Sequence, residues 1–309
     1  MRVLVAGATG VVGMPLVRQL IDRGHDVIGT TRSAEKAEGL RRLGAGAVIV
    51  DGLDAAAVGE AVARAEPEAI IHQMTNVSGK PDFRNFDRWF APTNALRTAG
   101  TDSLLAAARA VGVKRFVAQS FTGWNTIREG GPVKTEEDPF DPDPPRAASE
   151  TLSAIRYLER AVTGAPFEGI VLRYGSLYGP GASDPLVRAV RSRMLPILGG
   201  GGGVWSWTHV EDAAAAAALA LERGLPGTYN IVDDEPAPVS EWLPYLADIV
   251  GAKPPLHLPA WVGRLAAGEL LVRWMTQGRG ASNAKAKREL GLDLAWPSWR
   301  DGFRRGMTG

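Results

Sequence analysis

A short apolar run followed by three evenly spaced glycines opens this chain and limits its fold more than any other feature. Val3 to Ala6 predicts a β-strand, and a helical pattern runs from about Val12 to Arg23 and stops at Gly24. Glycines between a strand and a helix allow a tight turn, close approach of backbone to a phosphate, and close helix packing. The turn is therefore expected to hold a pyrophosphate at the helix N-terminus. The residues expected to hold it are Gly7, Thr9, Gly10, Val11, Val12 and Gly13.

The same unit of strand, turn and helix recurs through the first half of the chain. Further strands are expected at residues 25–29, 47–50, 69–72, 115–118 and 169–172, and one more at 228–232. Helices are expected over residues 92–111, 147–162 and 210–222. Alternating strands and helices predict an α/β fold with a Rossmann-type, doubly wound parallel sheet.

The alternation weakens after Arg173, which indicates a second, smaller unit. We expect residues 1–173 to form the dinucleotide-binding domain, with residues 204–232 returning to it. Residues 174–203 and 233–309 are then expected to form a smaller, mainly helical C-terminal lobe that binds substrate. Asp138 to Pro145 is rich in Pro and Asp, which predicts a surface loop.

Composition excludes several classes of function. Lys and Arg number 35 against 34 Asp and Glu, so no one-signed field is available for nucleic acid. The absence of cysteine excludes disulfides and thiolate chemistry, and no spacing of His, Asp and Glu predicts a metal site. No apolar run is long enough to span a bilayer and no leader pattern opens the chain, so a cytoplasmic protein without membrane partners is expected.

The residues after the second strand indicate which dinucleotide binds. An acidic residue there would bind a ribose 2′-hydroxyl, whereas an arginine accommodates a 2′-phosphate. The chain has Thr31, Arg32 and Ser33 at this place and no carboxylate. We therefore expect NADP(H) in preference to NAD(H), the alternative being that Arg32 is an ordinary solvated side chain.

Several motifs in order resemble the extended short-chain dehydrogenase/reductases, the NAD-dependent epimerase/dehydratase family. Besides the glycine turn, residues 173–180 read Arg-Tyr-Gly-Ser-Leu-Tyr-Gly-Pro and residues 207–212 read Trp-Thr-His-Val-Glu-Asp. Residues 282–285 and 289–291 are similar to segments of the family's C-terminal lobe. The resemblance implies that Asp51 lies near the adenine, and that Gln73 and Asn94 lie along the cofactor.

The chain departs from this family at the catalytic pair Tyr-x-x-x-Lys. Aligning Glu159 and Arg173 with their family counterparts puts Thr151 at the Tyr position and Ile155 at the Lys position. Neither side chain can donate and relay a proton as that pair does. Tyr157 points to another side of the helix. The chain thus resembles atypical members that keep the fold and cofactor without the dyad.

Four hydroxyl groups, those of Ser120, Thr122, Tyr174 and Tyr178, are candidates for the missing function. The family places a Ser or Thr after the fifth strand, so Ser120 and Thr122 are candidates, although such hydroxyls often cap backbone groups. Tyr174 stands where the family usually has Pro, and it either enters the pocket or packs in the core. His72 is expected to be a hydrogen-bonded residue in the wall of the site. His209 is expected to be part of a helix cap.

Aromatic residues suggest the wall of a substrate pocket. Phe83 to Phe90 interleaves aromatic and charged residues and is expected to form a loop over the active site. With Trp205, these residues would favour a flat or apolar substrate. The alternative is that the aromatic side chains only pack against one another under a loop. The substrate contacts expected are Trp124, Tyr178 and Trp207.

These features predict an NADP(H)-dependent oxidoreductase or epimerase-like enzyme acting on a small organic carbonyl or alcohol. The cofactor would carry the chemistry while the protein positions it. The alternative is a non-catalytic NADP(H)-binding sensor or regulatory protein, and non-redox isomerisation or cyclisation in the same pocket is also open. A homodimer is possible.

Overall fold

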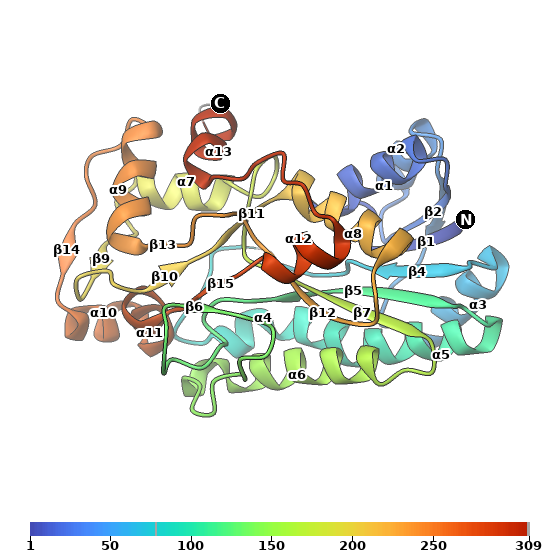
Figure 1. Ribbon diagram of the computed structural model, residues 1–309, viewed down its shortest axis with the longest axis horizontal. Helices are drawn as coiled ribbons and strands as arrows, with labels where there is room; N and C mark the ends of the chain where they lie inside the picture. The colour runs from blue at the N-terminus through green and yellow to red at the C-terminus, as the bar shows by residue number, and fades with distance from the viewer. Residues whose placement is uncertain (78, 308–309) are drawn as a thin grey trace.

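A seven-stranded, wholly parallel sheet forms the centre of the molecule in the computed structural model, which describes residues 1–77 and 79–307 (Figure 1). The strand order is β12-β7-β5-β4-β1-β2-β3. This arrangement confirms the doubly wound fold. The strands are β1 (Arg2–Ala6), β2 (Asp26–Thr31), β3 (Gly46–Ile49), β4 (Ala69–His72), β5 (Arg115–Phe121), β7 (Glu168–Tyr174) and β12 (Gly227–Ile231).

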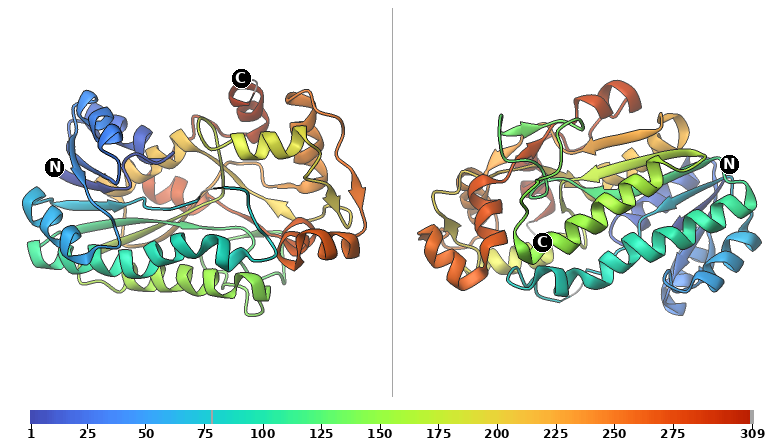
Figure 2. Two further views of the ribbon diagram at one scale, coloured as in Figure 1. Left: turned by 180° about the vertical axis from the view of Figure 1, so that it is seen from behind. Right: turned by 90° about the horizontal axis from the view of Figure 1, so that it is seen from below.

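Helices cover both faces of the sheet (Figures 1 and 2). On β1, Val3 and Val5 enter one apolar core, whereas Leu4 and Ala6 enter the other, as successive side chains of a doubly covered strand must. The first core includes side chains from α1 (Gly13–Asp22), α2 (Ala34–Arg42), α8 (Val210–Arg223) and α12 (Ala284–Leu290). The second includes side chains from α3 (Ala55–Ala65), α5 (Thr101–Val111) and α6 (Ser149–Thr163).

A separate, tryptophan-rich core lies beyond the end of the sheet. Trp205, Trp207, Trp242 and Trp299 are all buried in it. It is built mainly from β8 (Ser176–Tyr178), α7 (Asp184–Arg191), β9 (Ile197–Leu198), β10 (Val204–Trp205), β11 (Trp207–His209), β13 (Ala237–Pro238), α9 (Val239–Ile249), β14 (His257–Leu258), α10 (Ala260–Ala267), α11 (Glu269–Gln277) and α13 (Trp299–Gly306). The remaining short elements are β6 (Val133–Lys134), η2 (Arg146–Ala148) and β15 (Gly280–Ala281).

The segment expected as a loop at residues 83–90 is mostly helical, which corrects that prediction. α4 (Phe86–Ala95) begins there because Phe86, Trp89 and Phe90 recur at helical spacing and form one apolar face. The helix expected over residues 92–111 is divided. A π-helical segment, η1 (Leu96–Gly100), joins α4 to α5.

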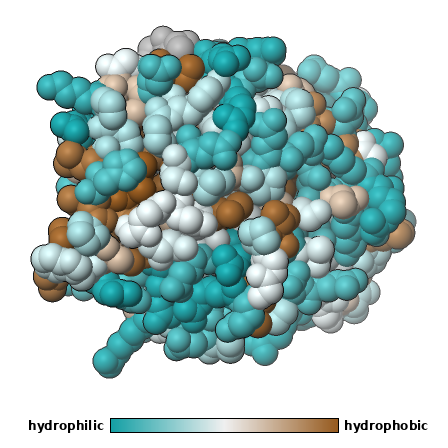
Figure 3. Space-filling model, turned by 60° about the vertical axis from the view of Figure 1, so that its left-hand side comes forward, coloured by the Kyte–Doolittle hydropathy of each residue, from teal (hydrophilic) through white to brown (hydrophobic). Residues whose placement is uncertain are grey.

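The surface of the described residues is mixed. Trp261 and Leu265 of α10 are among the most exposed large apolar side chains, and Figure 3 turns this end of the molecule forward. Brown, hydrophobic atoms gather there among hydrophilic ones. No helix in the described part of the chain combines the length and hydropathy that crossing a bilayer requires.

Candidate active site

Two glycines of the first turn occupy positions that no other residue fits. Gly7 has a φ of 87°, and a Cβ built on it would lie 2.7 Å from the backbone carbonyl carbon of Gln73. A Cβ on Gly13 would lie 2.3 Å from the carbonyl oxygen of Gly7. Gly10 is less constrained, and its N–H donates to Gly7 O at 3.1 Å. The sequence of the turn thus brings α1 directly against β1.

The turn presents the start of α1 at the carboxyl end of β1. No side chain caps this helix, whose N-cap residue is Val12. The strand order reverses between β1 and β4, which makes this edge the switch point where ligands bind in open α/β sheets. Free N–H groups and the positive end of a helix dipole at that point fit a pyrophosphate.

The end of β2 supplies hydroxyl groups and one free guanidinium. The Oγ1 atoms of Thr9 and Thr31 are 3.1 Å apart, which links the turn to β2. Ser33 Oγ caps α2 by accepting from Lys36 N–H at 3.3 Å. Arg32 is exposed, and within the described residues its side chain makes no hydrogen bond or ion pair. Its guanidinium is therefore available to an anion beside this turn.

A small apolar hollow lies between the sheet and helices α3 and α5. Val50, Gly52 and Met74 are among its lining residues, and Asp51 stands exposed at this edge. Asp51 Oδ1 accepts from Leu53 N–H at 3.0 Å, which fixes the loop after β3.

Gln73 directly follows β4, and its buried side chain is incompletely bonded. Its amide nitrogen donates to the Tyr174 hydroxyl at 3.0 Å, while its Oε1 is buried without a hydrogen-bond partner. Tyr174 is buried in the core under α8, and its hydroxyl also donates to Ala213 O at 3.4 Å. Burial raises the pKa of Tyr174, so the phenol stays protonated. These contacts make Tyr174 part of the sheet's core.

The Thr151 hydroxyl belongs to a helix cap that crosses between elements. Asp87 of α4 accepts from the backbone N–H groups of Glu150 and Thr151 at 3.0 and 2.8 Å. The Thr151 hydroxyl donates to the same carboxylate at 2.7 Å and accepts from the Asn94 amide at 3.0 Å. α6 has no capping side chain of its own. Asp87, which the sequence did not single out, therefore fixes α4 to α6.

Ile155 lies in an apolar, aromatic environment. It is buried in a cluster with Phe86, Trp124 and Leu270, and Phe121 packs against the same cluster. The rings of Phe86 and Trp124 meet edge to face with centroids 5.8 Å apart. An ammonium at this position would be buried without a partner. In addition, none of the five tyrosines in the sequence has a lysine four residues later.

Ser120 is joined to a buried ion pair. Its hydroxyl donates to Glu159 Oε1 at 2.7 Å, and Arg173 binds the same carboxylate through Nε and Nη2 at 2.9 and 2.7 Å. All three side chains are buried. Thr122 is also buried, and its N–H donates to Tyr174 O at 3.0 Å. Ser120 thus lies in a structural network between β5, α6 and β7.

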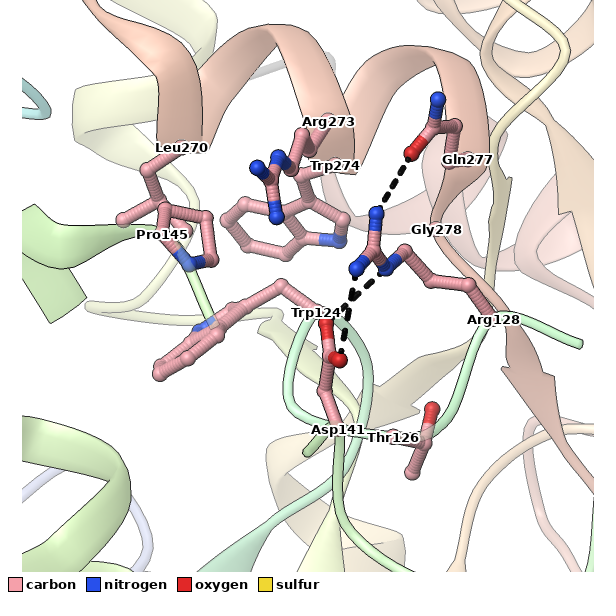
Figure 4. Close-up of a pocket in the computed structure, with 10 residues that line it drawn as sticks. All are labelled: Trp124, Thr126, Arg128, Asp141, Pro145, Leu270, Arg273, Trp274, Gln277 and Gly278. Atoms are coloured by element: carbon pink, nitrogen blue, oxygen red, sulfur yellow. Dashed lines mark hydrogen bonds and ion pairs between the residues drawn. The ribbon is translucent and has the colours of Figure 1, made fainter. Parts of the chain in front are cut away.

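The expected substrate aromatics separate into two groups. Tyr178 and Trp207 are fully buried in the tryptophan-rich core, with ring centroids 6.2 Å apart. Trp124 instead lines a small hollow beside α11 (Figure 4). Trp274, Arg128 and further residues of two loops complete its wall. No sequence pattern marks these partners, because they come from segments far apart in the chain.

Histidines near the strand ends are buried and neutral. Burial lowers the pKa of His72 to about 4, and its Nδ1 accepts from Met74 N–H at 3.2 Å. Burial also lowers the pKa of His209 to about 4, and its Nδ1 caps α8 by accepting from Glu211 N–H. These positions agree with a wall residue and a helix cap. Among the described residues, no group of three His, Asp or Glu could hold a metal ion.

Comparison with known proteins identifies the family. Residues 3–232 match the NAD dependent epimerase/dehydratase family. The chain is 43% identical over 312 residues to a 3-diazoavenalumate denitrifying reductase from Streptomyces sp, covering 99% of this chain and 100% of that protein. It is 32% identical over 266 residues to a 2-alkyl-3-oxoalkanoate reductase from Stenotrophomonas maltophilia, covering 82% of this chain and 76% of that protein.

Solved structures share the whole fold. The UDP-glucose 4-epimerase of Thermotoga maritima superposes with a TM-score of 0.78 at 23% identity, covering 98% of this chain and 96% of that one. A human epimerase family protein solved with NADPH gives 0.75 at 20% identity, covering 99% and 98%. With the family match and the named reductases, the comparisons establish an NAD(P)-dependent oxidoreductase or epimerase. The chain belongs to the NAD-dependent epimerase/dehydratase family, as its motifs predict.

Proposed function

We propose that this chain is an NADP(H)-dependent reductase that replaces the diazo group of an aromatic compound with hydrogen. The observation that carries the proposal is the 43% identity, over 99% of the chain, to the Streptomyces denitrifying reductase. Identity of this extent spans both the dinucleotide turn and the elements around Trp124. The sensor alternative is not favoured, because the two relatives named above are reductases.

The chemistry of the side chains agrees with this reaction. Reduction of a carbonyl leaves an oxygen that must receive a proton, which in this family the Tyr of the dyad would supply. Here Thr151 is bonded to Asp87 and Asn94, and Ile155 is apolar. An arenediazonium ion needs no such donor, so the expected loss of the dyad would not impair its reduction.

For the arenediazonium form the overall reaction balances without added protons, and where an ortho hydroxyl has ionised the product phenolate takes one proton from water. The reaction is Ar–N₂⁺ + NADPH → Ar–H + N₂ + NADP⁺. The reduced nicotinamide supplies a hydride when bound. In the arene the carbon–nitrogen bond breaks, a carbon–hydrogen bond forms at the same carbon, and N₂ leaves. The protein's part is to orient the arene and to exclude water from the site.

The cofactor would be held by the residues that the sequence singles out. Gly7 to Gly13 and the start of α1 would bind the pyrophosphate, while Thr31, Arg32 and Ser33 would bind the 2′-phosphate. The loop after β3, which carries Asp51, would lie beside the adenine ring. The free Oε1 of Gln73 and the half-buried Asn94 would face the ribose and nicotinamide.

A carbonyl reductase is the second candidate, favoured by the 32% identity to the 2-alkyl-3-oxoalkanoate reductase. Ser120, Thr122 or Tyr174 would then have to steer the oxygen. Because Ser120 donates to Glu159 and Tyr174 bonds Gln73 and Ala213, Thr122 would carry most of this task.

The two-lobe division, a homodimer and a cytoplasmic location stay predictions.

A substrate panel distinguishes the two functions. The full chain is mixed with NADPH and either 3-diazo-4-hydroxybenzoate or aromatic and 3-oxo ketones, and the loss of NADPH absorbance is followed. We expect oxidation with the diazo compound at a rate at least about tenfold above any ketone. Turnover of ketones alone would replace this proposal with the carbonyl reductase.

A further inference from the structure

Arg97 is a buried arginine that lacks a counter-charge. It lies in η1, the π-helical joint between α4 and α5, and only 7% of the residue is exposed. Within the described part of the chain, its guanidinium makes no hydrogen bond and no ion pair. Its Cζ lies 5.2 Å from the ring centroid of Phe90. A buried cation without a counter-charge is costly, and π-helical segments are frequent at functional sites, so Arg97 is a candidate binding residue.

The guanidinium of Arg97 stays positive and is still reached by solvent. Burial lowers the pKa of Arg97 to about 10, which leaves the group charged at neutral pH. None of its nitrogens is among the described polar atoms that are both fully enclosed and unpartnered. Because these nitrogens have no partner within the described residues, they must keep some exposure. The guanidinium is therefore open to a ligand.

The carboxylate whose charge acts on Arg97 is already occupied. Glu159 is close enough for its charge to oppose the effect of burial on the pKa of Arg97. Arg173 binds both oxygens of Glu159, at 2.9 and 2.7 Å, and Ser120 donates to one of them at 2.7 Å. The pair of Glu159 and Arg173 is balanced, so Arg97 adds one positive charge that this cluster does not neutralise.

Arg97 lies at the carboxyl end of β4, away from the residues expected to bind the cofactor phosphates. η1 packs against α6, which carries Thr151 and Ile155 and runs along α4 below the sheet (Figure 1). Burial lowers the pKa of His72, the last residue of β4, and the charge of Arg97 adds to this shift. The glycine turn and Arg32 follow β1 and β2, whereas β4 and β5 lie on the other side of β1. The cofactor phosphates are thus expected across the switch point from Arg97.

We propose that Arg97 binds an anionic oxygen of the aromatic substrate. That oxygen is either an ionised hydroxyl on the ring or a carboxylate, and a guanidinium binds both by charge-assisted hydrogen bonds. Phe90 stacks on Phe86 with ring centroids 5.2 Å apart, so a flat apolar surface lies beside the charge. The inference rests on the proposed function for the class of substrate, and it adds the group that the protein recognises.

Calorimetric titration of the full chain, saturated with NADP⁺, tests the assignment without turnover. The probes are 4-nitrophenol, 4-nitrobenzoate and the uncharged 4-nitroanisole, at a pH where both acids are ionised. Arg97→Met keeps an apolar stem of similar length, and it should weaken at least one anion about tenfold while changing nitroanisole less than about twofold. A loss confined to the phenolate identifies the ring oxygen, and a loss confined to the benzoate identifies the carboxylate.

The matched control is Arg109→Met, because Arg109 is exposed in the last turn of α5. It should leave the affinities for all three probes unchanged. The proposal is overturned if neither anion binds the natural chain more tightly than nitroanisole, or if Arg97→Met changes the anions and nitroanisole equally.

Two further measurements on Arg97→Met separate ligand binding from a structural role and from a cofactor role. Removal of a buried charge that has no counter-charge should leave the urea midpoint of unfolding unchanged or raise it, whereas loss of a structural ion pair would lower it. The affinity for NADP⁺ should change less than about twofold. A clearly lower midpoint, or a loss of NADP⁺ affinity as large as that of the anions, would refute the assignment.

The binding test and the reaction test fail independently. If Arg97→Met loses the anions as expected but the natural chain does not oxidise NADPH with the diazo compound, the anion site stands and the proposed reaction fails. If the diazo compound is reduced with the same kcat/KM by Arg97→Met, the reaction stands and Arg97 does not bind the substrate.

Discussion

Gly13 and Gly59 are both helical glycines, but only one of them faces a backbone atom. A Cβ on Gly13 would lie 2.3 Å from Gly7 O, whereas nothing lies within 4 Å of a Cβ on Gly59 inside α3. Gly13→Ala should therefore lower the free energy of unfolding by about 1–3 kcal/mol, and Gly59→Ala should raise it by about 0.5–1 kcal/mol. Urea unfolding measures both. Equal effects of the two substitutions would contradict the geometry of the turn.

Arg32 is the residue on which the cofactor preference depends. If its free guanidinium binds the 2′-phosphate, Arg32→Ser should weaken NADPH about 10–100-fold, the worth of a hydrogen bond to a charged group. NADH, which lacks the phosphate, should change little. Arg18→Ser, on the exposed face of α1, is the matched control and should alter neither affinity. Equal losses for both cofactors in Arg32→Ser would show that Arg32 is not a phosphate ligand.

Turn residues whose place depends on the local backbone are those that sequence predicts best. Gly7, Gly13 and Arg32 depend on spacing after a strand, which is visible in the chain itself. Arg128 and Arg273 meet at one hollow only because α11 folds back beside the loop after β5. No local pattern could predict that meeting.

At the scale of elements, one carboxylate connects two helices. Asp87→Ala removes the acceptor for the N–H groups of Glu150 and Thr151 at the start of α6, so the free energy of unfolding should fall by about 1–2 kcal/mol. Asp102→Ala is the control, because Asp102 also lies in the first turn of its own helix but, among the described residues, its carboxylate bonds the exposed Tyr157 and caps no other helix. Its effect should stay within about 0.5 kcal/mol. A comparable loss in both variants would contradict the cap.

The parallel strands are predicted within a few residues because apolar runs such as those of β4 and β7 are bounded by polar turns. The start of α4 is not predicted. Its apolar face is only one turn long, and Asp87 and Arg88 lie between the apolar residues. The helical spacing of apolar residues is therefore too short to recognise in the sequence. The π-helical joint between α4 and α5 also leaves no sequence signal, because it arises from how the two helices pack.

At the scale of the whole molecule, buried histidines couple stability to pH. Burial lowers the pKa of His209 to about 4, below its usual value, so the unfolded chain binds this proton first as pH falls. The stabilising contribution is complete above about pH 6.5 and is lost progressively toward pH 4. It amounts to at most about 3 kcal/mol. Burial of His72 also lowers its pKa to about 4, so its contribution to stability is lost over the same pH range.

His209→Asn isolates this effect, because asparagine can also cap α8 but does not titrate. Burial raises the pKa of Asp212 to about 6, so its contribution to the free energy of unfolding changes with pH in the opposite direction. This contribution is present in both proteins and cancels in the comparison. Urea unfolding between about pH 7 and pH 5 should show a shallower loss of stability in the variant. Parallel curves would mean that His209 is not held neutral.

The whole molecule thus combines a nicotinamide-binding sheet with a smaller, tryptophan-rich unit beyond the end of that sheet. The most direct test of the proposed reaction is the amount of N₂ released per NADPH oxidised when the full chain consumes 3-diazo-4-hydroxybenzoate. We expect one N₂ and one 4-hydroxybenzoate for each NADPH. Oxidation of NADPH without release of N₂, or release of N₂ at the same rate without NADPH, would contradict it.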